Sequence, residues 1–114
     1  MRHLFVATSD ARRKCRVEEV KDAHGALEAL RPVSYHWRDE QPDGMAKPDD
    51  RKHFGVLAQE AEEVCPSAVL SNADGYKSVD YQSLFTLLMA SHKELLVEHH
   101  ALVARVAALE ALGA

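Results

Sequence analysis

Residues 84–112 read LFTLLMASHKELLVEHHALVARVAALEAL, and their apolar spacing governs the shape that we expect for the whole protein. Apolar residues recur at alternating spacings of three and four, which is the heptad pattern of a coiled coil. A helix of this length extends about 43 Å at 1.5 Å per residue, farther than a domain of this size can cover. We therefore expect much of the helix to pack against other copies of the chain. The expected seam consists of Phe85, Leu88, His92, Leu95, His99, Leu102, Val106 and Leu109.

Two positions of this seam carry histidine, His92 and His99. A polar layer at inner heptad positions fixes the register of a coiled coil at some cost in stability. A ring of imidazoles is alternatively able to bind a metal ion or an anion, or to act as a pH switch. Leu96 and Val103 widen the apolar stripe beyond a two-helix seam and therefore favour three or more helices.

The composition describes one ordinary globular domain and limits its partners. The chain has 114 residues, of which 46% are hydrophobic, and a net charge of −4. A nucleic-acid-binding domain would show a basic stripe. A DNA-binding leucine zipper would need a basic helix before it, whereas residues 78–88 contain no Lys or Arg. The apolar runs are far shorter than the roughly 20 residues of a membrane span. We therefore expect no nucleic acid and no membrane as a partner.

The sequence predicts no metal site and no cofactor. Apart from His99 and His100, the seven histidines are scattered, and no Cys or carboxylate lies at the spacing of a ligand set. Cys15 and Cys65 also lack metal-site spacing. We expect both to be reduced thiols, the commoner state in the cytosol.

The remaining sequence predicts an α+β domain, with a small antiparallel sheet and short helices before the long C-terminal helix. Periodic apolar residues predict helices, alternation predicts strands, and Gly and Pro mark turns. Gly55 is expected where backbone packs closely or bends. In chain order we expect a strand at 4–7, a helix at 17–30, a strand at 33–37, a solvated loop at 39–52, a strand at 54–58, a helix at 59–64, and a hairpin of 69–70 and 76–79 around a turn at 72–75.

Residues 8–14 read TSDARRK and place a hydroxyl nucleophile, Ser9, five residues before an amine, Lys14. Serine needs a base to take its proton, and lysine is such a base only when neutral. The positive charges of Arg12 and Arg13 favour the neutral amine. Residues five apart share neither a helix face nor a strand face. The two side chains therefore meet only across a turn or with help from another chain. The alternative interpretation is a short basic loop, turned by Ser9 or Asp10.

Several motifs follow one another in a distinctive order: SDxRxK (9–14), PVxYxW (32–37), HFGVLAQE (53–60), a proline at 66 and VDY (79–81), which leads into the long helix. This order resembles the peptidase S74 family, the self-cleaving intramolecular chaperone domain at the C-terminus of phage tailspikes and tail fibres, endosialidases among them. The resemblance extends from Ser9 to about Leu109.

The resemblance implies a parallel homotrimer that directs the folding of an upstream fibre or tailspike polypeptide and then cuts itself off between Thr8 and Ser9. It implies residues 1–8 as a residual upstream strand and residues 9–114 as the chaperone domain, with an α+β head (9–83) and a coiled-coil helix (84–112). It also implies action in the cytoplasm of the infected bacterium, on a client destined for the virion tail. The catalytic residues carried over are Ser9 as nucleophile, Lys14 as base, and Asp10 and Arg12 as further motif residues, with His53, Gln59 and Glu60 in possible support.

Two alternatives stay open. Glu60 also suits the N-terminus of a helix through the helix dipole, which would need no role in cleavage. The whole chain is alternatively a non-catalytic trimerisation module that holds a partner in register without cutting it. Only residues 1–8 precede Ser9, so we expect either an excised piece of a longer fibre or a small reading frame whose client is lost or encoded elsewhere.

Overall fold

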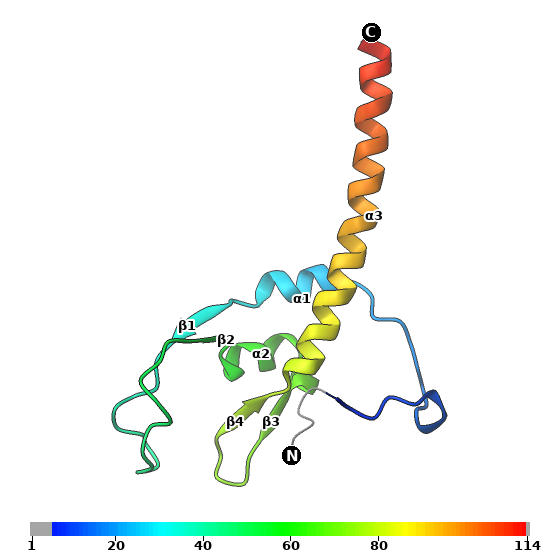
Figure 1. Ribbon diagram of the computed structural model, residues 1–114. Helices are drawn as coiled ribbons and strands as arrows, with labels where there is room; N and C mark the ends of the chain where they lie inside the picture. The colour runs from blue at the N-terminus through cyan, green and yellow to red at the C-terminus, as the bar shows by residue number, and fades with distance from the viewer. Residues whose placement is uncertain (1–5, 114) are drawn as a thin grey trace.

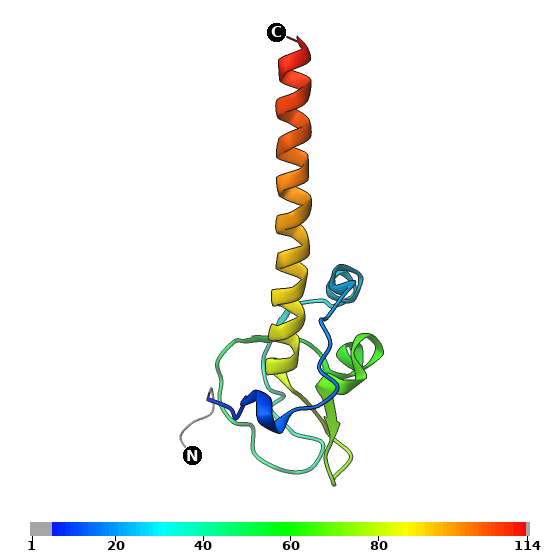
Figure 2. The same cartoon turned by 90° about the vertical axis from the view of Figure 1, so that its right-hand side faces the viewer.

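A computed structural model describes residues 6–113, which form one long helix with a small head at its base (Figure 1). The molecule measures 69 × 39 × 27 Å along its principal axes, so it is elongated. Figure 2, turned by 90°, shows the helix rising straight from the head. In chain order the elements are the 3-10 turn η1 (Ala11–Arg13), α1 (Ala23–Ala29), β1 (Val33–Tyr35), β2 (His53–Gly55), α2 (Ala58–Val64), the 3-10 turn η2 (Pro66–Ala68), β3 (Val69–Ser71), β4 (Lys77–Val79) and α3 (Tyr81–Gly113).

The long C-terminal helix is confirmed. It begins at Tyr81, slightly before the expected start, because Asp80 caps it. The Asp80 carboxylate accepts hydrogen bonds from the hydroxyl of Ser83 (2.8 Å) and from the backbone N–H of Gln82 (3.1 Å). These hydrogen bonds hold the pKa of Asp80 below its usual value, and the bond from the Ser83 hydroxyl is the largest cause. They also satisfy backbone donors that the first turn of a helix otherwise leaves without a partner.

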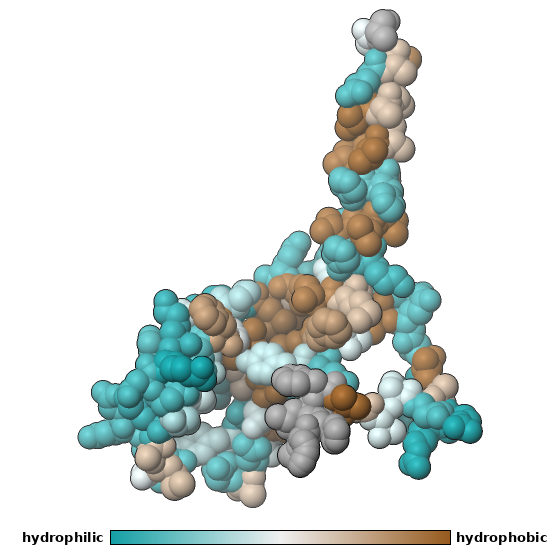
Figure 3. Space-filling model, viewed as in Figure 1, coloured by the Kyte–Doolittle hydropathy of each residue, from teal (hydrophilic) through white to brown (hydrophobic). Residues whose placement is uncertain are grey.

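The head packs against one face of α3 and leaves the expected seam uncovered. Leu84 and Ser91 are buried, whereas Phe85 and His92, each one position further on, are exposed. Successive residues lie about 100° apart around a helix axis, and residues four apart lie on the same side. The seam therefore borders the covered face, since Leu88 and Leu95 lie four positions after Leu84 and Ser91 and are nevertheless exposed. All eight seam residues are exposed in the single chain, and hydrophobic side chains lie in patches along α3 (Figure 3).

Within residues 6–113 the strands form two separate two-stranded sheets rather than the single small sheet expected. β1 pairs with β2 and β3 pairs with β4, both antiparallel. β2 ends at Gly55 because the following N–H, that of Val56, donates to the hydroxyl of Tyr81 (3.2 Å) instead of to a strand. A side chain at Gly55 would meet the same hydroxyl. The close backbone packing expected at this glycine is therefore confirmed.

The first helix is shorter than the sequence predicts. The apolar spacing indicates a helix over residues 17–30, but α1 spans only Ala23–Ala29. Arg16 and Asp22 have positive φ angles of 54° and 56°, which lie in the left-handed region and interrupt a right-handed helix. The prediction of a helix was consequently wrong for residues 17–22.

Glu94 of α3 sets the point at which α1 begins. α1 has no side-chain cap from its own N-cap residue. Instead, the Glu94 carboxylate accepts hydrogen bonds from the backbone N–H groups of Ala23 (2.9 Å) and His24 (3.3 Å). The His24 ring also contacts Ser91 (2.7 Å) and Glu98 (3.3 Å) on the same side of α3. The start of α1 is therefore fixed by residues of another helix. The hydrogen-bonded residues of the two helices lie 67–71 positions apart in the sequence.

The other expected elements lie close to their predicted positions. β1, α2 and the β3–β4 hairpin are confirmed within a few residues, and residues 38–52 form neither helix nor strand, as a solvated loop requires. Residues 4 and 5 of the expected strand at 4–7 lie outside the described residues, and residues 6–10 form no strand. Cys15 and Cys65 are free thiols. In the described part of the chain, no helix is apolar over a sufficient length to cross a membrane.

Residues 6–22 form an N-terminal arm that stands apart from the core. Every residue of the arm is exposed, and in Figure 1 the arm leaves the base of the molecule as an open loop before it returns to α1. The core itself is small, so much apolar surface stays available for contact with other copies. The buried residues of the described chain are Ala23, Ala61, Ala68, Leu84 and Ser91.

Replacing Glu94 by Ala should loosen α1. Two N–H groups lose their acceptor, and loss of a helix N-cap lowers the free energy of unfolding by about 0.5–2 kcal/mol. Amide hydrogen exchange at Ala23 and His24 should accelerate, and the denaturant midpoint should fall. Glu94→Gln keeps one carbonyl oxygen and should lose less, whereas Lys93→Ala, at the exposed neighbouring position, should be close to neutral. Unchanged exchange at Ala23 in Glu94→Ala would show that α1 does not depend on this cap.

Candidate active site

Ser9 and Lys14 form a dyad on the N-terminal arm. Lys14 Nζ donates a hydrogen bond to Ser9 Oγ at 2.6 Å. The chain reverses between them through η1, where the N–H of Arg13 bonds to the carbonyl of Asp10 (3.0 Å) and that of Lys14 to the carbonyl of Ala11 (3.1 Å). The two side chains thus meet across a turn, within one chain.

Asp10 and Arg12 form an ion pair in the same turn. Asp10 Oδ1 accepts a hydrogen bond from the backbone N–H of Arg12 at 2.9 Å and so caps η1. The Arg12 guanidinium donates to both carboxylate oxygens, from Nε at 3.0 Å and from a terminal nitrogen at 2.9 Å. The side-chain bonds to Arg12, and then the backbone bond, hold the pKa of Asp10 below its usual value. The same pair raises the pKa of Arg12.

The dyad has the groups and the contact that proton transfer needs. A neutral amine within hydrogen-bond distance of a hydroxyl is able to act as its general base and so to activate it as a nucleophile. Ser9 and Lys14 are both exposed in the single chain. The described residues of this one chain therefore do not shield the dyad from water.

His53 lies in the head, in a cluster of aromatic side chains. Its ring stacks on Tyr35, with centroids 5.5 Å apart, and meets Trp37 edge-on at 5.8 Å. Its Nε2 atom hydrogen-bonds to the Asp49 carboxylate at 2.8 Å, and this bond is the first cause that holds the pKa of Asp49 below its usual value. These contacts attach the long loop to the β1–β2 pair, so in the single chain His53 serves the structure of the head.

Gln59 and Glu60 lie at the start of α2. Glu60 is in the first turn and Gln59 is exposed beside it. Glu60 forms a two-point ion pair with Arg31, at 2.7 Å and 3.2 Å. The hydrogen bond from Arg31 lowers the pKa of Glu60. Among residues 6–113, no hydrogen bond joins the three supporting residues of the head to the dyad on the arm.

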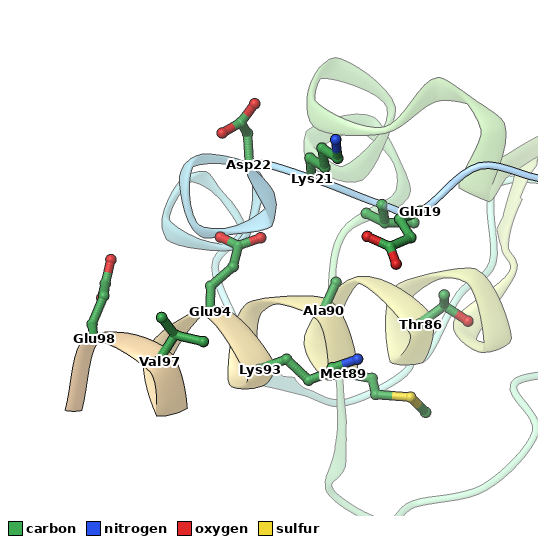
Figure 4. Close-up of a pocket in the computed structure, with 11 residues that line it drawn as sticks. Glu19, Lys21, Asp22, Thr86, Met89, Ala90, Lys93, Glu94, Val97 and Glu98 are labelled. Carbon is green, nitrogen blue, oxygen red and sulfur yellow. The ribbon is translucent and has the colours of Figure 1, made fainter. Parts of the chain in front are cut away.

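A groove of about 620 Å³ lies between the end of the arm and α3 (Figure 4). Apolar side chains from both segments line it, together with acidic and basic ones, and the dyad is not among them. In Figure 4 the Glu94 carboxylate points from α3 to the start of α1. The sequence assigned no role to Glu94 or to His24 because no local pattern links positions that far apart. Within residues 6–113, no group of three His, Cys, Asp or Glu side chains is placed to hold a metal ion.

A comparison with protein families identifies what the arm and the head resemble. A family model described as chaperone of endosialidase, Peptidase S74, matches residues 9–70, more than half of the chain. The match begins at Ser9, includes the dyad, α1, the β1–β2 pair and α2, and ends within β3. α3 lies outside the match. No curated protein matches the chain in sequence.

The Arg31–Glu60 ion pair predicts sensitivity to acid. The pKa of Glu60 is depressed in the folded state, so its contribution to stability is fully present above the ordinary value of 4.5 and is lost as pH falls through the folded value. Glu60→Gln should therefore lower the Tm at about pH 7, and the difference from the wild type should shrink towards about pH 3. Arg31→Ala should cause a similar loss, and the double variant little more.

Glu63→Gln is the matched control, because Glu63 is an exposed glutamate on the same helix. Its effect on the Tm should be small and should not vary with pH in this way. If Glu60→Gln and Glu63→Gln have the same pH profile, the ion pair with Arg31 does not contribute to stability.

Proposed function

The chain belongs to the Peptidase S74 family, the chaperones of endosialidase, and we propose that it directs the trimerisation and folding of a phage tailspike or tail-fibre polypeptide. In this proposal it then releases itself by cutting its own chain between Thr8 and Ser9. The family supports the role in assembly. The observation that supports the proposed cleavage is the 2.6 Å contact between Ser9 Oγ and Lys14 Nζ. Ser9 is also the first residue of the family match.

The proposed reaction is a single turnover. The neutral amine of Lys14 takes the hydroxyl proton of Ser9, and the oxygen attacks the carbonyl carbon of Thr8. The bond from that carbon to the Ser9 nitrogen breaks, the nitrogen receives the proton from Lys14, and an ester joins Thr8 to Ser9 Oγ. Water then hydrolyses the ester, which leaves a carboxylate on Thr8 and an α-amino group on Ser9. The attacking hydroxyl is alternatively supplied by a neighbouring subunit.

The proposed trimer is supported by the exposed seam of α3. Leu95, Leu102 and Leu109 are 52%, 55% and 65% exposed in the single chain, although their heptad spacing is that of an inner stripe. Leu96 and Val103, at 41% and 53%, widen the stripe beyond what two helices cover. Parallel association of three α3 helices would bury this surface while the heads stay outside it.

The client in this proposal is the fibre polypeptide upstream of Ser9, in the cytoplasm of the infected bacterium before the virion tail is assembled. The alternative is a trimerisation module without cleavage. It is favoured by the exposure of the dyad in the single chain, because an activated lysine base usually lies where water is partly excluded. Both functions require the trimer, so the cleavage experiment separates them.

Assembly is tested by shortening the leucines of the seam. Leu95→Ala and Leu102→Ala should each cost about 2–5 kcal/mol of assembly and folding free energy per buried site, because each leaves a cavity. Light scattering should show a wild-type trimer and a shift of the double variant to monomer. Val97→Ala should stay trimeric, since Val97 is 69% exposed and lies outside the seam. A wild-type monomer at tens of micromolar would contradict the proposal.

Cleavage is tested by fusing the chain behind a folded trimeric β-fibre segment, so that a client precedes Thr8. Intact mass spectrometry should show scission between Thr8 and Ser9. Ser9→Ala should abolish it, because a methyl group cannot accept the acyl group. Lys14→Arg should also abolish it, because a guanidinium stays protonated and cannot act as a base.

Cys15→Ser is the matched control for these variants, because Cys15 is an exposed nucleophile next to the dyad. It should leave the cleavage rate unchanged. A fusion that is fully trimeric and stays uncut would favour the non-catalytic module. Cutting of Ser9→Ala at the same bond would show that Ser9 is not the nucleophile.

A further inference from the structure

The η1 turn, which brings the dyad together, is held by bonds within residues 9–14. It has three residues and lies on the exposed arm. A single turn is unfavourable by itself, because several dihedral angles are fixed for one backbone hydrogen bond. The Asp10 carboxylate adds a further bond by accepting from the backbone N–H of Arg12 at 2.9 Å. The contact between Ser9 and Lys14 therefore depends on the cap that Asp10 supplies.

Arg12 fixes the carboxylate that caps the turn. Its Nε and a terminal nitrogen reach Oδ1 and Oδ2 of Asp10, at 3.0 Å and 2.9 Å. This two-point geometry matches the planar fork of a guanidinium to a carboxylate and restricts the rotation of Asp10. Both oxygens of Asp10 are thereby engaged by Arg12 and not by the lysine of the dyad.

The ion pair with Arg12 also balances the negative charge of Asp10, which lies in the same turn as Lys14. The other charged residues of the segment 9–16 are Asp10, Arg12, Arg13 and Arg16, and Asp10 is the one anion among them. A carboxylate left without Arg12 would stabilise the ammonium form of the lysine. The ammonium form cannot take the proton from the serine hydroxyl. Engagement of Asp10 by Arg12 therefore occupies the one carboxylate of this segment.

We propose that Asp10 and Arg12 are positioning residues of the self-cleavage reaction and not catalytic ones. Asp10 holds the turn that sets Ser9 Oγ against Lys14 Nζ. Arg12 fixes the Asp10 side chain and neutralises its charge beside the amine. This inference rests on the proposed function, and it distinguishes the two motif residues from the dyad with which the sequence grouped them.

A double-variant cycle on the trimeric fusion tests these roles through the rate of cleavage as a function of pH. Asp10→Ala removes the cap and should slow cleavage by about tenfold or more at every pH, because the dyad is misplaced. Asp10→Asn keeps an oxygen that caps the turn and should restore most of the rate. Arg12→Ala leaves an unpaired carboxylate, so its rate profile should move to higher pH. The combination of Asp10→Asn with Arg12→Ala should return the profile to that of the wild type.

Two results would overturn the inference while leaving the proposed function intact. If Asp10→Asn is as slow as Asp10→Ala although both fusions are trimeric, the carboxylate itself takes part in the chemistry. If Arg12→Ala has the wild-type pH profile, Arg12 does not shield the amine. Arg13→Ala is the matched control, because it removes one positive charge and leaves the Asp10–Arg12 pair in place. Adding Asp10→Asn should not reverse the effect of Arg13→Ala on the pH profile.

A second measurement separates failure of this inference from failure of the proposed function. NMR amide temperature coefficients of Arg13 and Lys14 in the full chain report whether their N–H groups are hydrogen-bonded in η1. They should show loss of these bonds in Asp10→Ala and retention in Asp10→Asn. If the fusion is never cut, the proposed function fails, and these coefficients still decide whether Asp10 holds the turn. Coefficients unchanged by Asp10→Ala would overturn the positioning role.

Discussion

The carboxylate of Glu94 joins two parts of the molecule that lie far apart along the chain. It accepts hydrogen bonds from the first backbone N–H groups of α1, those of Ala23 and His24. It thereby attaches the end of the arm to the middle of α3. α1 has seven residues and no side-chain cap of its own, so it is a helix that needs this partner. The arm precedes α1 and the β1–β2 pair follows it, so this attachment joins both segments to α3 through α1.

α3 presents two adjoining faces. One face, around Leu84 and Ser91, holds the head, and the next face carries the heptad seam. The two faces adjoin each other, and the seam side chains stay exposed with the head in place, so they remain available for the proposed contact with other α3 helices. This exposure is the physical basis for proposing that the same helix assembles the trimer and supports the head.

The dyad is organised locally, whereas its surroundings are not. Ser9 and Lys14 meet because a short turn, capped by Asp10, brings them together on an exposed arm. The family match begins at this dyad and continues through the head. Residues 6–113 of the single chain leave the dyad open to solvent. In the proposed reaction, a client or neighbouring copies would be able to exclude water from it.

The local sequence pattern was enough to predict α3, α2, the hairpin and the solvated loop, since each depends on apolar periodicity or on turn residues within a few positions. The motif order likewise predicted Ser9 and Lys14 as a candidate dyad, and the turn brings their side chains to 2.6 Å. The shorter α1, the two separate sheets and the placement of Glu60 in the head came from contacts between distant residues. Glu94 caps α1 and Tyr81 ends β2 across such distances. A local pattern carries no information about which distant side chain supplies a missing hydrogen-bond partner, and only the folded chain brings the two together.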